Sequence, residues 1–251
     1  MRENIKTTLV KEFLEHQEFL GCYEGGSAAF GRDDEWSDID LQIVVKDDFV
    51  EQAVQILEKA MQSVAPIEES FILPAPTWHG HWQGFYKLKD ISPYLLMDVL
   101  IMKESSPSYF TEVELHGTPH IFFDKTGRLG KEHIDTEELT KILPIRIKRI
   151  EYVSKMFHLF IDKEIKRNRA MDAFDLYYNL LLRSLVELLR IKYDPARWSF
   201  GCRYLSHDLP VEIYQEIKAF SYVRDLADLQ QQKDKVLQKI NSLLAEDLIP
   251  K

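Results

Sequence analysis

Cysteine, long apolar runs and positive charge are all scarce in this sequence. Its 251 residues include two cysteines, Cys22 and Cys202, which are too few for a disulfide framework or a four-thiolate zinc site. No stretch approaches the roughly 18 uninterrupted apolar residues of a membrane span, so we expect no membrane segment. The opening residues mix charged and apolar side chains and lack the apolar core of a signal peptide, so we expect a cytoplasmic protein.

The scarcity of positive charge bears on the partners of the protein. Lys and Arg number 32, whereas Asp and Glu number 41, which gives a formal net charge of −9. General nucleic-acid binders usually carry a basic surplus, because contacts with phosphate groups supply most of their affinity. We therefore expect no nucleic-acid partner, and a cationic small substrate suits the overall field better.

The remaining composition is that of an ordinary globular protein. It is 45% hydrophobic and 29% charged, which excludes a disordered or low-complexity chain. The first half alternates helix and strand patterns, as read from the spacing of apolar residues and from turn residues. We expect helices over residues 3–20 and 48–63, and strands over residues 39–45, 67–73, 84–89, 94–102 and 119–123.

Beyond about residue 135, long helical patterns replace the strand patterns. The spacing predicts helices over residues 145–167, 170–193, 210–219 and 222–245, with Pro144 interrupting whatever precedes the first of them. A mixed first part and a helical second part predict an α+β fold in two domains. We place a small mixed sheet flanked by helices in residues 1–130, and an all-α helical bundle in residues 131–251.

Two acids near the start of the chain point to metal chemistry. Asp38 and Asp40 are two residues apart at an expected strand, so both side chains leave the same face. Two neighbouring carboxylates repel each other unless a cation lies between them, and Mg²⁺ prefers such oxygen ligands. A third acid, Asp98, lies inside the apolar run 94–102, where burial is costly unless the carboxylate binds something. If the two strands are neighbours, three carboxylates converge.

The segment just before these acids has the features of a phosphate site. Gly26 and Ser27 follow an expected helix and would open the next one, which would expose backbone N–H groups and a hydroxyl to phosphate oxygens. Arg32 could add a charge-assisted contact with the same phosphates. Acids that hold Mg²⁺ beside a phosphate site form the layout for phosphoryl or nucleotidyl transfer.

These motifs resemble those of the nucleotidyltransferase superfamily typified by DNA polymerase β, whose sites combine Gly-Ser, a spacer, Asp-x-Asp and a distant third acid. Gly26-Ser27 and the sequence Ser-Asp-Ile-Asp-Leu at 37–41 match this pattern, and Asp98 fits the third acid by placement. The resemblance covers residues 1–125. The helical part that follows looks like that of the nucleotidyltransferases that adenylate aminoglycosides and lincosamides.

The resemblance implies an enzyme with two Mg²⁺ ions and a nucleoside triphosphate donor, ATP first. Asp38 and Asp40 would hold the metal ions. Asp98 would help to hold one of them and would take the proton from an acceptor hydroxyl that attacks the α-phosphorus, and pyrophosphate would leave. The nucleotide-binding residues implied are Gly26, Ser27, Arg32 and Ser37. The acceptor would be a small molecule, with an aminoglycoside-type antibiotic as first candidate and antibiotic resistance as the role.

Several alternatives stay open. The acceptor could be a protein or another metabolite, or the chain could be a non-catalytic nucleotide-binding or antitoxin-like module. Glu104 is a second candidate for the general base. Asp172 and Asp175 open an expected helix, where acids suit the helix dipole, and are also candidate contacts for a cationic acceptor. The oligomeric state is open between monomer and homodimer.

Two histidines precede the expected strand at 84–89. His79 and His81 have a spacing that could put both on one strand face, but no third metal ligand accompanies them. We interpret them as cleft or loop residues near the substrate.

Overall fold

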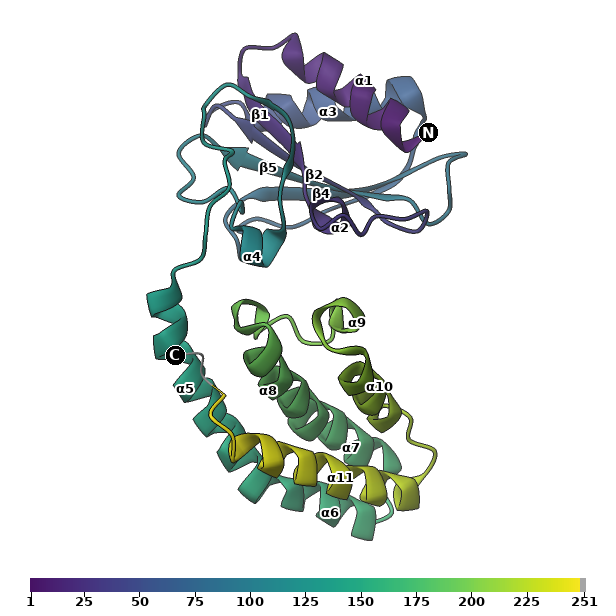
Figure 1. Cartoon of the computed structure of the whole chain (residues 1–251). Coiled ribbons are helices and arrows are strands. Elements are labelled where there is room, and N and C mark those ends of the chain that lie inside the picture. The colour runs from purple at the N-terminus through teal and green to yellow at the C-terminus, as the bar shows by residue number, and fades with distance from the viewer. Residues whose placement is uncertain (249–251) are drawn as a thin grey trace. The chain divides into compact units, whose positions relative to one another are not determined.

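The structure is a computed structural model that describes residues 1–248. The chain divides into two compact units, Met1–Ile134 and the residues from Asp135 onward (Figure 1). Within residues 1–248, no helix is long and apolar enough to cross a membrane.

The first unit is built on a six-stranded sheet. Its strand order is β3-β4-β5-β2-β1-β6, in which β2 and β5 are parallel and the other neighbours are antiparallel. This confirms the mixed sheet expected from the sequence. The strands are β1 Phe19–Glu24, β2 Ile39–Val45, β3 Ile67–Ile72, β4 Trp82–Leu88, β5 Leu96–Lys103 and β6 His120–Asp124.

Two helices cover one face of this sheet. Helices α1 (Arg2–Leu14) and α3 (Val50–Val64) lie side by side on it (Figure 1), and their apolar residues share a core with the strands. Ile5, Leu9 and Phe13 supply the buried side of α1 at helical spacing. The two remaining helices of this unit are short: α2 Gly26–Ala29 and α4 Val113–His116.

One expectation for this unit is wrong. The opening helix was expected to reach residue 20, but α1 ends at Leu14 and residues 19–24 form β1, which the sequence interpretation missed. All six residues of β1 are buried, because the strand lies between β2 and β6 with both faces covered. The residues from Phe19 to Tyr23 show no alternation of apolar and polar side chains that would separate this strand from a helix.

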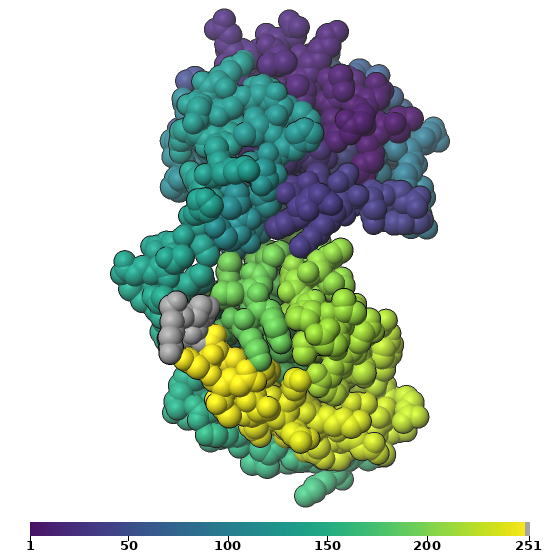
Figure 2. All heavy atoms as spheres, viewed as in Figure 1, coloured from purple at the N-terminus to yellow at the C-terminus, as the bar shows by residue number. Residues whose placement is uncertain are grey.

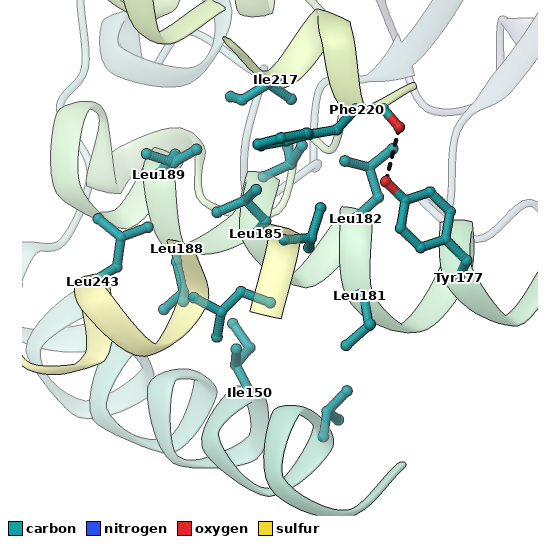
Figure 3. Packing of buried hydrophobic residues seen from close by; sticks show 14 of the residues in the cluster. Ile150, Tyr177, Leu181, Leu182, Leu185, Leu188, Leu189, Ile217, Phe220 and Leu243 are labelled. Atoms are coloured by element: carbon teal, nitrogen blue, oxygen red, sulfur yellow. Dashed lines mark hydrogen bonds between the residues drawn. The ribbon is translucent and has the colours of Figure 1, made fainter. Parts of the chain in front are cut away.

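In the part of the second unit that the structure describes, helices surround one apolar core. The buried residues of this core include Ile150, Leu185 and Leu188, and the Tyr177 hydroxyl donates a hydrogen bond of 2.8 Å to the Phe220 carbonyl (Figure 3). The helices are α5 Thr136–Tyr152, α6 His158–Lys166, α7 Ala170–Leu176, α8 Arg183–Tyr193, α9 Leu205–Asp208, α10 Val211–Phe220 and α11 Leu226–Leu244.

Short irregular helical segments connect several of these helices. Two π-helical segments, Val153–Phe157 and Tyr177–Leu182, join α5 to α6 and α7 to α8, and Pro195–Arg197 forms a 3₁₀ turn after α8. The last long helix, α11, lies partly at the surface of the unit, where it is the yellow region of Figure 2.

The start of α5 also differs from the expectation. The helix begins at Thr136 rather than near residue 145, and Pro144 lies inside it. Asp135 caps the helix by accepting hydrogen bonds from the backbone N–H groups of Glu137 and Glu138. A proline inside a helix removes one hydrogen bond, but Leu143 is buried in the core and packing holds this turn in place.

Candidate functional site

The central feature of the first unit is a pair of acids on neighbouring parallel strands. Asp40 on β2 and Asp98 on β5 are register partners, so their backbones lie about 4.8 Å apart and their side chains leave the same face. Their neighbours along β2, Ile39 and Leu41, are fully buried on the other face, whereas Asp40 and Asp98 are both half-buried. The pairing that the sequence interpretation required of these strands is therefore present.

Asp38 lies one residue before β2, on the same side of the strand as Asp40. Its carboxylate accepts a hydrogen bond of 3.3 Å from the backbone N–H of Leu96, the first residue of β5. The guanidinium of Arg2 in α1 donates to the carbonyls of Ser37 and Asp38, the latter at 2.7 Å. The backbone that carries Asp38 is thus tied to both α1 and β5.

The surroundings of Asp98 change its acidity. Burial raises the pKa of the Asp98 carboxyl above its ordinary value, and the charge of Asp38 adds to the rise. A hydrogen bond of 2.7 Å from the side-chain amide of Gln83 opposes the rise but does not cancel it. A carboxylate in such a place accepts a proton more readily than an ordinary aspartate, which suits a general base.

The turn at Gly26 lies directly against Asp40. Gly26 has a φ of +55°, and a Cβ added there would lie 1.7 Å from Oδ2 of Asp40. Only glycine fits at this position. Because it has no side chain, the start of α2 can lie against the Asp40 carboxylate. The backbone N–H of Gly25 also donates to the Asp40 carbonyl at 2.9 Å. The fold therefore brings together the Gly-Ser and Asp-x-Asp motifs, and half-buried Ser27 follows Gly26 in the same turn.

Arg32 and Ser37 lie on the loop between α2 and β2. The Arg32 guanidinium lies 5.0 Å from the centre of the Phe30 ring. The Ser37 hydroxyl donates to the Asp34 carboxylate at 2.9 Å and accepts from the Asp34 backbone N–H at the same distance. Ser37 thus closes a local turn just before Asp38.

The alternative base Glu104 lies at the other end of β5. It comes six residues after Asp98, roughly 20 Å along the strand at about 3.3 Å per residue. Its carboxylate forms a salt bridge of 2.8 Å with Lys46, which follows β2. Distance and charge pairing both separate Glu104 from the Asp40–Asp98 pair.

Asp172 and Asp175 belong to the second unit, where both are exposed on α7. The Asp175 carboxylate accepts a hydrogen bond of 2.8 Å from the side-chain amide of Asn179, one turn further along. Asp172 lies in the first turn of the helix, where the helix dipole favours an acid.

Asp38, Asp40 and Asp98 offer only oxygen donors, which is the ligand chemistry that Mg²⁺ prefers. In the described part of the chain, no three His, Cys, Asp or Glu side chains are arranged as a ready metal site. Mg²⁺ usually takes one or two protein carboxylates and completes its shell with phosphate oxygens and water. The register pair, with the Gly26 turn against it, fits that mode of binding.

The sequence interpretation missed one residue beside this site. Gln83 on β4 reaches Asp98 diagonally across the antiparallel β4–β5 pair, and His79 in turn contacts Gln83. From the sequence, His79 is interpreted as a cleft or loop residue near the substrate, but it is not connected to Asp98. Nothing in the local sequence indicates that Gln83 faces an acid, because this depends on the register of two strands.

Comparison with known proteins gives resemblances in structure alone. No family model and no curated protein matches the sequence. One similar solved structure is spectinomycin adenyltransferase AAD(9) from Enterococcus faecialis with ATP and spectinomycin, at 14% identity and a TM-score of 0.35, covering 97% of this chain and 89% of that one. Another is an H. pylori protein assigned as a nucleotidyltransferase, at 12% identity and a TM-score of 0.32, covering 96% and 95%.

Both resemblances extend over nearly the whole chain. The chain is similar to one structure described as an adenyltransferase and to another described as a nucleotidyltransferase.

Proposed function

We propose that the first unit is the catalytic domain of a Mg²⁺-dependent nucleotidyltransferase, which transfers a nucleoside monophosphate to a hydroxyl group and releases pyrophosphate. The observation that carries this proposal is the Asp40–Asp98 pair on adjacent parallel strands, with the Gly26 backbone against the Asp40 carboxylate. The pair concentrates negative charge beside a turn that a side chain would block. A divalent cation that carries phosphate groups suits both features.

Asp38, Asp40 and Asp98 are the residues that would hold Mg²⁺. When bound, the ion would neutralise charge on the triphosphate and on the leaving pyrophosphate. Gly26 and Ser27 would bind the triphosphate through the backbone and the hydroxyl, and Arg32 would add a positive charge from the same loop. Ser37, which we had expected to contact the nucleotide, would act by holding the turn that presents Asp38.

Asp98 would act as the general base. Its raised pKa favours acceptance of the proton from the acceptor hydroxyl as the oxygen attacks the α-phosphorus in line. A bond forms between that oxygen and the α-phosphorus. The bond from the α-phosphorus to the oxygen that leads to the β-phosphorus breaks, and pyrophosphate leaves with the electron pair. The proton on Asp98 then passes to solvent.

The second unit would bind the acceptor, and an aminoglycoside-type antibiotic is the first candidate, with ATP as the donor. The formal net charge of −9 suits a cationic acceptor, and Asp172 and Asp175 offer exposed carboxylates on α7. A protein or metabolite hydroxyl is the alternative acceptor. A non-catalytic nucleotide-binding or antitoxin-like module is the alternative without chemistry, and the half-buried acid pair argues against it, because simple binding needs no such pair.

The test is pyrophosphate release with Mg²⁺, each of the four ribonucleoside triphosphates, and a panel of aminoglycosides, lincosamides and spectinomycin. Asp40→Asn is the site variant. Asp48→Asn, an exposed acid beyond the other end of β2, is the matched control. We expect release that requires one acceptor, disappears in Asp40→Asn and persists in Asp48→Asn. Full turnover by Asp40→Asn would contradict the assignment of Asp40 to the metal site. If the protein binds nucleotide in a Mg²⁺-dependent way but releases no pyrophosphate with any member of the panel, an antibiotic is not the acceptor.

A further inference from the structure

A chain of hydrogen bonds leads from Asp98 to the turn before β4. The side-chain amide nitrogen of Gln83 donates to Oδ1 of Asp98 at 2.7 Å. The amide oxygen of Gln83 lies 3.0 Å from Nε2 of His79. All three side chains are half-buried, so the chain is partly shielded from water.

The hydrogen bonds of the other ring nitrogen of His79, Nδ1, determine the donor-to-acceptor direction of this series of hydrogen bonds. The backbone N–H of His81 donates to Nδ1 of His79 at 3.1 Å, so Nδ1 must offer a lone pair. The Thr77 hydroxyl lies 3.4 Å from Nδ1, but its single proton is given to the His81 carbonyl at 2.6 Å. The proton of the neutral imidazole is therefore on Nε2, which donates it to the oxygen of Gln83.

This tautomer fixes the orientation of the Gln83 amide. With its oxygen held by His79, the amide can present only its NH₂ group to Asp98. A flipped amide would place its oxygen against the carboxylate oxygen and its NH₂ group against the N–H of His79. Both contacts would be repulsive, since each would pair two acceptors or two donors.

We propose that Gln83 and His79 are positioning residues, which hold Oδ1 of Asp98 and so fix the rotation of the carboxylate toward the acceptor hydroxyl. This inference rests on the proposed role of Asp98 as the general base. Neither residue exchanges a proton with the substrate. Their effect passes through the orientation of Asp98 and therefore falls on the chemical step rather than on nucleotide binding.

Two pairs of substitutions separate positioning from simple packing. In His79→Gln, the side-chain NH₂ can replace the Nε2–H donor to Gln83. In His79→Asn, the shorter side chain can still accept from the His81 N–H but does not reach Gln83. Gln83→Met keeps the length of the side chain and removes both hydrogen bonds. His133→Asn, an exposed histidine far along the chain, is the control for a His-to-Asn change.

Kinetics gives the first readout. We expect His79→Asn and Gln83→Met to lower kcat about tenfold, with KM for the nucleotide changed by less than about twofold. His79→Gln should restore kcat to within about threefold of the unchanged protein, and His133→Asn should have no effect. Normal kcat in both His79→Asn and Gln83→Met would overturn the inference and leave the proposed function intact. Normal turnover by Asp98→Asn would instead contradict the role of Asp98 as the general base, and no pyrophosphate release by the unchanged protein would contradict the proposed function.

Nitrogen-15 NMR gives a second readout that needs no acceptor. The neutral imidazole of His79 should be the Nε2–H tautomer. Replacement of Asp98 by Leu should shift both the Gln83 side-chain amide and His79 signals, whereas His133→Asn should shift neither. An Nδ1–H tautomer of His79, or Gln83 signals insensitive to Asp98→Leu, would overturn the inference even if no acceptor is found.

Discussion

The two ends of the β2–β5 strand pair carry acids in opposite settings. At one end, Asp98 pairs in register with Asp40 and lies close enough to Asp38 for the charge of Asp38 to contribute to the raised pKa of Asp98. At the other end, six residues further along each strand, Glu104 forms a salt bridge with Lys46. The second arrangement neutralises its own charge, whereas the first brings carboxylates together. Carboxylates that the fold holds side by side indicate a site that binds a cation or transfers a proton.

Another acid close to the site sharpens the contrast. Glu24, the last residue of β1, is almost completely buried, and its carboxylate lies 2.8 Å from the ammonium group of Lys6 in α1. Lys6 also pairs with Glu3 at 2.6 Å. Glu24 directly precedes the Gly25–Gly26 turn, and Asp40 lies against the same turn. These two acids therefore have different roles at one turn. Glu24 anchors α1 on the sheet, and Asp40 faces the turn.

The largest effect is expected for Asp98→Asn. This change keeps the size of the side chain and removes the base, so turnover should fall at least about 100-fold. Folding should not suffer, because burial and the Asp38 charge already disfavour the ionised form of Asp98. Initial rates of pyrophosphate release, with urea unfolding as the control, test this. A stable variant with an unchanged rate would return the role of the base to another residue.

Glu24→Gln should affect stability. The change leaves the Lys6 ammonium buried with only Glu3 as a partner, and we expect a loss of about 2 kcal/mol in the free energy of unfolding. Burial lowers the pKa of Lys6, but the bonds to Glu24 and Glu3 outweigh it and raise the pKa above 10.5. The stabilisation is therefore complete below pH 10.5 and is lost as the pH rises through the higher value of the folded protein.

Urea unfolding of both proteins from pH 8 to pH 11.5 measures this effect. The unchanged protein should lose stability toward the upper end of the series. Equal stability of the two proteins at pH 8 would show that the buried pair does not anchor α1.

Gly26→Ala and Gly31→Ala form a matched pair. Both glycines have positive φ, at +55° and +62°, so each alanine should cost about 1 kcal/mol of stability in backbone strain. A Cβ at Gly26 meets Asp40, whereas a Cβ at Gly31 has no atom within 4 Å. Only Gly26→Ala should displace the Asp40 carboxylate, and we expect its turnover to fall about tenfold. Equal turnover rates for the two variants would show that the close approach of Gly26 to Asp40 is not needed for activity.

The smallest effect is expected for Glu104→Gln, which is also the control for Asp98→Asn. Its partner Lys46 is close to half exposed, and pairs of this kind contribute little. Turnover should stay within about twofold of the unchanged protein in the same pyrophosphate assay. A strong loss of activity would show that the two ends of the strand pair are not as different as their charges indicate.

Much of the first unit could be predicted, because β2 to β6 and α3 carry either alternation or helical spacing with turn residues at their ends. β1 could not, since a strand covered on both faces lacks alternation. The Gly-Ser and Asp-x-Asp motifs could be placed near each other from sequence alone, because only the ten residues 28–37 separate them. The contact of Gly26 with Asp40 depends on the backbone angle φ of Gly26, which no sequence pattern predicts.

The sequence interpretation placed Asp98 beside Asp40 on the condition that their strands are neighbours. The strand order and parallel register that meet this condition depend on non-local pairing, which the sequence pattern does not report. Gln83 reaches Asp98 only because β4 pairs with β5 in one particular register, and a slip of one residue would turn Gln83 to the other face. The tautomer of His79 depends in turn on the Thr77–His81 turn.

The most direct test of the account compares Asp98→Asn and Glu104→Gln in one experiment with Mg²⁺, ATP and the acceptor panel. Both the phosphate product and the mass of the acceptor are measured. The account predicts pyrophosphate, an acceptor heavier by one nucleotidyl group (a nucleoside monophosphate less one water), and the loss of both signals in Asp98→Asn alone. Equal loss in the two variants, or orthophosphate with an unmodified acceptor, would contradict it.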